Sequence, residues 1–384
     1  MNFSLTDDLL MLRDSANSFL KKELDLTPLL TPGATVGDAG YDNLWSKIST
    51  LGWPAMMVPE VYGGLGMSML DLSMIAGECG RFLAPLPLFG TLAGMWAIDM
   101  FGSDAQRERW LGEVAVGSLK LALAHPELDH ACEWLADGVA VADAGEGVTL
   151  SGTYRFVVDA AASDKIVVLA GQAGQPRCWI VDRAAPGVDI EVLEWRDITR
   201  QVCRVHLRHA PAELLAGSHE HISDAWPWIR DRLLLLLAAE SAGGLHAVLD
   251  DTVAYAKERV AFGRPIGAYQ AIKHSLADML VHAECASTAV LYAAWALSEG
   301  DEAAPLAVAM AQSYASDAYC DASFRSIQVF GAIGFTWEMK NHLYFKRARA
   351  NAELLGSPQQ HRERIIRILE ARHREAAVDA SLLV

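Results

Sequence analysis

The chain has 384 residues, of which 52% are hydrophobic and 21% are charged. That length exceeds one simple core, so we expect two or three domains in an ordinary globular protein. The formal net charge of -16 argues against a nucleic-acid partner, because binding a phosphate backbone requires a basic face.

The sequence carries no clear signal for export, membrane insertion or disulfides. Its start, MNFSLTDD, is acidic rather than basic, so we expect no secretory signal peptide. The longest apolar run, residues 233–239, is much shorter than a bilayer span, so we expect no membrane segment. The cysteines form no CxxC pair and have no His spacing suited to zinc, which indicates a reduced cytoplasm and no metal. They are Cys79, Cys132, Cys178, Cys203, Cys285 and Cys320.

Residues 1–118 are predicted to be helical. Apolar residues recur at helical spacing after Thr6, an expected N-cap that is followed by two aspartates where the helix dipole favours acids. A second helix is expected over 69–83. The glycine-rich stretch 58–66 predicts a tight turn before it.

From about residue 119 to residue 222 the hydrophobic period changes to two. Short β-type runs are separated by Gly, Asp and Pro, so we predict a small middle β-barrel domain. The remainder, 223–384, returns to a helical period and is predicted to be a helical bundle. The β-type runs are 119–123, 139–141, 148–152, 156–158, 165–169, 178–181 and 203–207.

The clearest motif is ERVAFGRPIGAYQAIKHSLADM, residues 258–279. Gly263 and Gly267 allow a positive φ, and Pro265 keeps the residue before it out of the helical conformation. A helical period resumes after Gln270. The stretch therefore predicts a helix, a fixed turn and a second helix.

This stretch resembles the acyl-CoA dehydrogenase family, whose members carry an Arg, then Phe-Gly-x-Pro-Ile, a Gln and Leu-Ala-Asp-Met at this spacing. The later QVFGAIGFTWE, residues 328–338, is similar to the family's Gln-x-x-Gly-Gly-x-Gly-Phe motif, and PEVYGGLG at 59–66 is typical of its first domain. The resemblance implies an α+β multidomain fold with an N-terminal α-helical domain (1–118), a middle β-barrel (119–222) and a C-terminal four-helix-bundle-type domain (223–384). It also implies an acyl-CoA substrate, FAD as cofactor and a flavoprotein electron acceptor.

The matching residues imply a particular way of holding FAD. In the family, residues of these two motifs reach the pyrophosphate and adenosine end of an FAD held mainly by a neighbouring subunit. An arginine opposite a pyrophosphate is an expected pairing, because the guanidinium presents parallel donors. The second Gly of the later motif is Ala332 here. The implied contacts are Arg259, Phe262, Gln270, Gln328 and Gly331.

The resemblance is weaker where the family contacts the flavin ring. Phe156 keeps an aromatic side chain, but Val158 replaces a Thr and cannot form a hydrogen bond. The family's Thr-Glu-Pro-x-x-Gly-Ser-Asp loop appears as AHPELDHA at 124–131, where His130 is no substitute for a short hydroxyl. The chain's own flavin-ring site therefore departs from the family pattern. The remaining implied FAD contacts are Ser357 and Gln359.

The catalytic base of the family has no counterpart at either known position. The commonest position precedes Gly-Thr near the C-terminus, and Leu355 occupies it. An ungapped count places the other position at Leu233. Leucine cannot accept a proton. Glu240 is a weak alternative base, and a carboxylate that is satisfied by a neighbour or lines a cavity is the stronger interpretation of it.

One branch of the family accounts for both absences. Bacterial acyl-CoA dehydrogenases for bulky substrates, including steroid side-chain CoA esters, are α2β2 heterotetramers in which one subunit lacks the Glu. The residues at 334–338 and 346–349 resemble that subunit. We therefore expect a chain that completes a partner's FAD site. The alternative is a self-sufficient homotetramer, or a related flavoenzyme, with a non-standard base such as Glu240.

Other side chains have both a structural and a functional interpretation. Lys346, Arg347 and Arg349 are expected to form a solvated helix face, with a grip on CoA phosphate as the alternative. Asp231 and Arg232 are expected to begin a helix, which makes Arg232 a weak candidate for contact with CoA.

The remaining aromatic and charged residues favour structural roles. Large aromatics in a helical bundle are usually core, although they can also shape a flat substrate pocket. We expect core positions for Trp226, Trp228 and Trp337, a surface or interface position for His274, and surface charge pairs for Glu363, Arg364 and Arg367.

Overall fold

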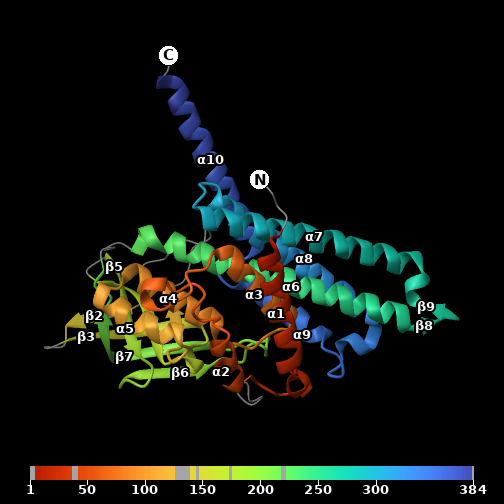
Figure 1. Ribbon diagram of the computed structural model, residues 1–384, viewed down its shortest axis with the longest axis horizontal. Coiled ribbons are helices and arrows are strands. Elements are labelled where there is room, and N and C mark those ends of the chain that lie inside the picture. The colour runs from red at the N-terminus through yellow and green to blue at the C-terminus, as the bar shows by residue number, and fades with distance from the viewer. Residues whose placement is uncertain are drawn as a thin grey trace.

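The computed structural model describes residues 5–36, 42–125, 139–143, 147–172, 175–217 and 222–382. The chain forms a layer of short helices, a seven-stranded sheet and a group of long helices in that order. In Figure 1 the sheet lies at one end of the molecule and the long helices run from it to the other end.

The N-terminal helices begin at caps that the sequence supplies. The Thr6 hydroxyl accepts a hydrogen bond from the Leu9 amide, as predicted, and Ser68 and Ser103 each form a reciprocal capping box with the residue three positions later. The turn after Pro59 places Gly63 at a φ of 82°, a conformation that favours glycine. The elements are α1 (Asp7–Glu23), η1 (Thr27–Leu30), α2 (Asp42–Thr50), η2 (Glu60–Tyr62), α3 (Met69–Arg81), α4 (Leu88–Phe101) and α5 (Asp104–Ala115).

The middle of the chain is a curled sheet with strand order β1-β4-β5-β7-β3-β2, in which β6 also pairs with β7. The two runs predicted at 148–152 and 156–158 belong to one strand, β3. Bulges in its pairing with β7 interrupt the side-chain alternation, so the sequence pattern divides into two runs. The sequence prediction missed β6. The elements are β1 (Leu121–Ala124), β2 (Val139–Asp143), β3 (Val148–Val158), η3 (Ala160–Ala162), β4 (Lys165–Gln172), β5 (Gln175–Asp182), β6 (Val188–Val192) and β7 (Val202–Leu214).

The long helices are organised around α6. Two helices are long and apolar enough by composition to cross a bilayer, but the apolar window of α6 is 83% buried inside the protein, as in a core helix. The corresponding window of α7 is only 33% buried, so an apolar helix face remains uncovered in the single chain. The elements are α6 (Ile222–Glu258), β8 (Val260–Ala261), β9 (Arg264–Pro265), η4 (Ile266–Ala268), α7 (Gln270–Glu299), α8 (Ala304–Phe330), η5 (Gly331–Phe335), α9 (Asn341–Glu353) and α10 (Pro358–Leu382).

Glycines allow α3 and α6 to cross at close range. A Cβ atom on Gly243 would lie 1.8 Å from the Gly77 carbonyl oxygen, and one on Gly80 would lie 2.0 Å from the Glu240 oxygen. Side chains at these two positions would force the helices apart. This contact fixes α6 against the N-terminal helices and so sets one side of the pocket described below.

Candidate active site and cofactor-binding surface

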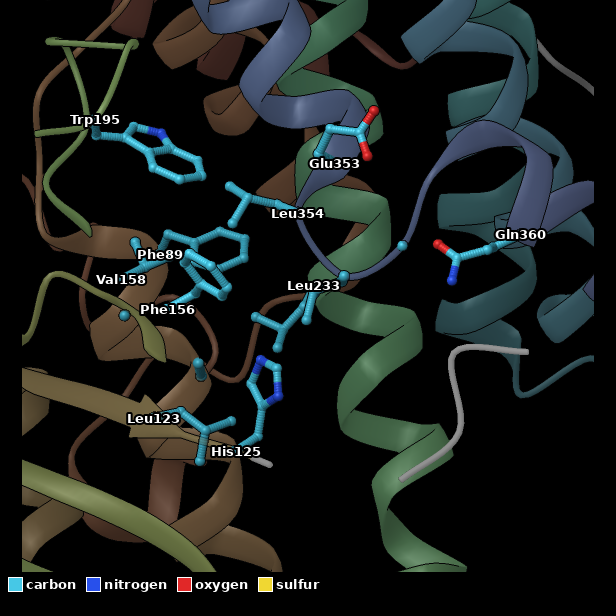
Figure 2. A pocket seen from close by; sticks show the side chains of 14 residues that line it. Phe89, Leu123, His125, Phe156, Val158, Trp195, Leu233, Glu353, Leu354 and Gln360 are labelled. Atoms are coloured by element: carbon cyan, nitrogen blue, oxygen red, sulfur yellow. The ribbon is translucent and has the colours of Figure 1, made fainter. Parts of the chain in front are cut away.

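A cavity of about 440 Å³ lies where the sheet, α4, α6 and the turn between α9 and α10 meet. Its walls are mostly apolar and aromatic, with few polar groups, as is usual for sites that bind organic ligands. Figure 2 shows Phe89, Phe156 and Trp195 gathered on one side and Leu233 and Leu354 facing them. The polar side chains that line the cavity are His125, Glu353 and Gln360.

Both residues that the sequence predicts at the family's base positions line this cavity. Leu233 on α6 is 2% exposed, and Leu355 in the turn after α9 is 9% exposed. Leu355 has a φ of 60°, a left-handed conformation that costs a non-glycine residue on the order of 1 kcal/mol. This strained turn therefore presents an alkyl group at one of the two predicted base positions.

Glu240 lies outside the residues that line this cavity. Its carboxylate accepts hydrogen bonds from Arg200 at 2.5 Å and from Arg347 at 3.4 Å, and the residue is 8% exposed. The carboxylate is thus occupied by two guanidiniums and is not directed at the cavity. This arrangement agrees with the interpretation of Glu240 as a satisfied carboxylate.

The sequence interpretation missed several residues of the cavity. Glu353 lies only two positions before Leu355, and this proximity was the signal that could have pointed to it. His125 belongs to the segment that replaces the family's loop, and its ring lies 5.2 Å from that of Trp226. Phe89 and Trp195 gave no sequence signal, because only the fold brings α4 and the segment after β6 to the same cavity.

The flavin-ring positions lie at this cavity as well. Phe156 and Val158 at the end of β3 line it, and Phe156 is 54% exposed, with its ring 6.0 Å from that of Trp195. The Trp195 indole N–H is buried without a hydrogen-bond partner among the described residues, so it is available to donate to an acceptor such as a ligand carbonyl oxygen. Ser357 caps α10 by exchanging hydrogen bonds with Gln360, beside the cavity, and Gln359 is exposed. The 126–131 part of the replaced loop, including His130, lies outside the described residues.

The turn after α6, which carries the first family motif, is a small hairpin. It projects from the end of the molecule opposite the cavity. In Figure 1, β8 and β9 lie far from the sheet, at the end of the long helices. Phe262 at its tip is 97% exposed, with a φ of 52°, and Gly263 has a φ of 81°, as predicted for a glycine there. The prediction of a positive φ for Gly267 was wrong: a Cβ on that residue would lie 2.9 Å from the Ala256 oxygen, so close packing requires the glycine.

The two family motifs meet at this end of the molecule. Arg259, Phe262 and Gln270 surround the hairpin and are exposed. Gln328 and Gly331 lie at the end of α8, which is joined to α6 by the stacked rings of Tyr255 and Phe330, 4.0 Å apart. Gly331 has a φ of 71°, which favours glycine.

The predicted FAD residues therefore form two separate groups in one chain. Leu233, at the cavity, and Glu258, at the end of α6, are separated by roughly 38 Å along the helix, at about 1.5 Å per residue. The residues at the cavity and those at the hairpin therefore do not form one compact site within a single chain.

Three predictions about charged residues were wrong. Arg347 is not on a solvated face: it is 1% exposed. Arg364 is also buried, and its guanidinium lies 2.7 Å from the Asp231 carboxylate. Asp231 and Arg232 do not begin a helix, because α6 starts at Ile222.

Arg232 packs within its own helix. Its guanidinium lies 3.2 Å from the ring centroid of Trp228 and donates to that residue's carbonyl oxygen at 3.1 Å. Burial lowers the pKa of Arg232 to about 10. It is not among the residues that line the cavity.

The remaining side chains divide between core and surface. His274 is exposed, and Glu363 pairs with Arg367 at 3.8 Å on the surface, as predicted. Trp226 is 1% exposed and belongs to the core. Trp337 is 36% exposed, so its predicted core position was wrong.

Comparisons with known proteins agree with this architecture. The model of the acyl-CoA dehydrogenase N-terminal domain matches residues 6–118, and that of the C-terminal domain matches residues 232–370. Acyl-CoA dehydrogenase IpdE2 of Mycobacterium tuberculosis (strain ATCC 25618 / H37Rv) is 34% identical, over 94% of this chain and 96% of its own.

Solved structures show the same fold. Butyryl-CoA dehydrogenase from Megasphaera elsdenii superposes with a TM-score of 0.85 at 24% identity, covering 96% of this chain and 100% of that chain. A variant of the Tcur3481-Tcur3483 steroid ACAD superposes with a TM-score of 0.81 at 26% identity, covering 96% of this chain and 99% of that chain. The chain belongs to the acyl-CoA dehydrogenase family, which confirms the predicted helical, β and helical fold and the prediction of a flavoprotein oxidoreductase that uses FAD.

Proposed function

We propose that this chain is the subunit of an acyl-CoA dehydrogenase that completes the FAD site of an unlike partner subunit, and that the partner supplies the catalytic Glu. One observation carries the proposal. Leu233 and Leu355, the residues predicted at the two family base positions, both line the chain's own cavity. An alkyl group there cannot remove the α-proton of a thioester.

The hairpin end supports the role of a donor of cofactor contacts. Arg259, Phe262 and Gln270 are exposed beside a projecting turn, where a second chain can reach them. Their distance from the chain's own cavity supports a role toward a cofactor seated in another subunit. Phe262, almost fully exposed and in a strained conformation, is the expected apolar contact with that subunit.

The uncovered face of α7 supports an assembly of several chains. Only 33% of its apolar window is buried in the single chain, and Leu280 and Val281 are 48% and 60% exposed. A partner that covered this face would gain free energy from burying it. The related steroid ACAD is named for two chains, Tcur3481 and Tcur3483. This similarity favours an assembly of two unlike chains here, with a bulky or steroid side-chain acyl group as substrate.

In the proposed enzyme, FAD when bound would supply the acceptor for the β-hydride, the partner's Glu would take the α-proton to give the trans-2-enoyl-CoA, and an electron-transfer flavoprotein would reoxidise the cofactor. This chain's contribution is to bind and orient. Arg259 would hold the pyrophosphate, and Gln270 and Gln328 would hold the same end of the dinucleotide. In its own cavity, Phe156 and Trp195 offer aromatic surfaces, but Val158 offers no hydrogen bond to a flavin ring.

A self-sufficient enzyme is the second candidate, and one observation favours it. Glu353 lines the cavity two positions before Leu355 and is an ionisable group of this chain within the site. Glu240, held by Arg200 and Arg347, is less suited to that role. In Figure 2 the Glu353 carboxylate points away from Leu233 and His125, so a base at this position would need a different rotamer.

The two candidates differ in flavin content. The chain would be purified alone and after co-expression with a paralogous acyl-CoA dehydrogenase subunit that has the family Glu, and flavin absorbance would be measured per chain. The proposal predicts flavin only in the pair, at about half an FAD per chain. Full flavin occupancy and acyl-CoA oxidation by the chain alone would exclude it.

A further inference from the structure

A fully buried arginine joins the sheet domain to the long helices directly behind the cavity. Arg347 on α9 is 1% exposed, and its Nε lies 2.5 Å from the Asp197 carboxylate. One terminal nitrogen donates to the Thr199 carbonyl oxygen at 2.9 Å and to its hydroxyl at 2.7 Å. The other lies 3.4 Å from Glu240 on α6. One guanidinium therefore holds the segment between β6 and β7 against two helices.

A second buried arginine closes the same cluster from the sheet side. Arg200 donates to Glu240 at 2.5 Å and to the Asn351 side-chain oxygen on α9 at 2.9 Å. Its guanidinium also lies 5.3 Å from the ring centroid of Phe89 on α4. The cluster thus contacts α4, α6, α9 and the segment before β7, which are elements that surround the cavity.

The residues held by this cluster are sequence neighbours of the cavity walls. Asp197 follows Trp195 by two positions, and Asn351 precedes Leu354 by three. Figure 2 shows Trp195 and Leu354 facing each other across the cavity. Displacement of either segment would change the shape of the space between them.

Stability alone is a weak reason for such a cluster. Replacing buried charges by apolar residues of similar volume is often neutral or stabilising, whereas removing a single partner leaves an uncompensated charge. The cluster instead fixes the segment between β6 and β7 against α6 and α9. We propose that Arg347 is a positioning residue, which holds the Trp195 segment and the Leu354–Leu355 turn at the separation that the cavity requires for its ligand.

The first test compares Arg347→Met with Arg349→Met in the full chain. Arg349 is an exposed arginine on the same helix, so the control makes the same chemical change at a position where the cluster is not affected. Backbone amide exchange would be followed by mass spectrometry. We expect exchange in 193–200 and 353–357 to rise at least tenfold in Arg347→Met and to stay within twofold of wild type in Arg349→Met. Unchanged exchange in both segments of Arg347→Met would overturn the proposal.

A second variant separates positioning from stability, because Arg347→Met leaves Asp197 without a counter-charge, whereas Glu240 keeps Arg200. The double change Asp197→Asn and Arg347→Met removes both charges of one pair and leaves the Arg200–Glu240 pair in place, and we expect it to recover most of the lost stability. If Arg347 positions the walls, the two segments still exchange rapidly in the double variant at matched global stability. Return of wild-type exchange with the return of stability would mean that the role is only structural. The readout needs neither a partner nor flavin, so its failure is distinct from failure of the proposed function.

Discussion

Leu233 on α6 and Leu355 in the turn after α9 line the same cavity, and each lies where the sequence motifs led us to expect the family's catalytic carboxylate. The cavity is present and the backbone at Leu355 is strained, but both side chains are apolar. A cavity of this composition favours an apolar group and excludes proton transfer at either position.

The role of Arg259 can be tested by its removal. In the assembled enzyme, Arg259→Ala should weaken FAD binding by about 10-fold to 100-fold, because one charge-assisted hydrogen-bonding side chain contributes roughly 1.5–3 kcal/mol. The residue is exposed, so the melting temperature of the single chain should not change. Flavin absorbance after dialysis gives the measurement. Arg264→Ala in the same hairpin is the control, since Arg264 stacks on Tyr269 at 4.1 Å. Equal flavin loss in both variants would contradict the specific assignment.

The two proposed sources of the catalytic base predict different effects for Glu353→Gln. If the partner supplies the base, the turnover of the assembled enzyme should stay within about twofold of wild type. A general base contributes roughly 100-fold to 10,000-fold, so a loss of that size would identify Glu353 as the base and favour a self-sufficient enzyme. Steady-state oxidation with an artificial acceptor gives the rate, and Glu338→Gln at an exposed position serves as the control.

Asp159 makes stability depend on pH. It is 5% exposed, its carboxylate accepts from the Gly90 amide at 3.0 Å, and burial raises its pKa to about 7. The folded state therefore keeps a proton on Asp159 that the unfolded state releases near pH 4. The contribution of this proton to the stability of the fold is complete below about pH 4 and is lost as pH rises through about 7.

Asp159→Asn removes this contribution without changing the left-handed backbone, since Asn tolerates the φ of 62°. We expect the wild-type free energy of unfolding to fall by up to about 1.4 kcal/mol per pH unit relative to the variant across pH 5 to 7. Urea titrations at several pH values measure the difference. Asp164→Asn, at an exposed position, should run parallel to wild type. A constant difference between Asp159→Asn and wild type would refute the assignment.

The crossing of α3 and α6 predicts opposite effects at two glycines. Gly243→Ala places a Cβ 1.8 Å from the Gly77 oxygen and should destabilise the chain by about 1–3 kcal/mol. Gly77→Ala places its Cβ at an ordinary 3.8 Å from the Ala239 oxygen and should stabilise the chain by about 0.5–1 kcal/mol through helix propensity. Thermal unfolding of the two variants gives both signs, and destabilisation of similar size in both would contradict the packing argument.

Local sequence signals predicted much of the fold. The cap at Thr6, the turn before α3 and the turn over 262–267 depend on the conformational preferences of a few adjacent residues, and each was found where it was predicted, although α6 ends earlier, at Glu258. The missed strand β6 is short and mostly exposed, so its alternation of apolar residues was weak. The bulges in β3 also could not be read from a period of two.

The site was only partly predictable, because its parts come from distant segments. A basic pattern on α9 has the same appearance in sequence whether it faces water or a buried acid, and only packing against Asp197 shows that Arg347 is buried. The same is true of Phe89 and Trp195, whose common cavity depends on how α4 and the segment before β7 approach α6.

The sequence by itself determined the order of helical, β and helical segments, the hairpin that carries Arg259 and Phe262, and the absence of a carboxylate at Leu233 and Leu355. These features are properties of residue type and of short-range backbone preference. The tertiary structure decided that both leucines line one cavity, that Glu240 is held by two arginines, and that the hairpin lies at the opposite end of α6 from that cavity. The physical reason is that burial, ion pairing and separation across the molecule arise when distant segments pack together, which no local pattern encodes.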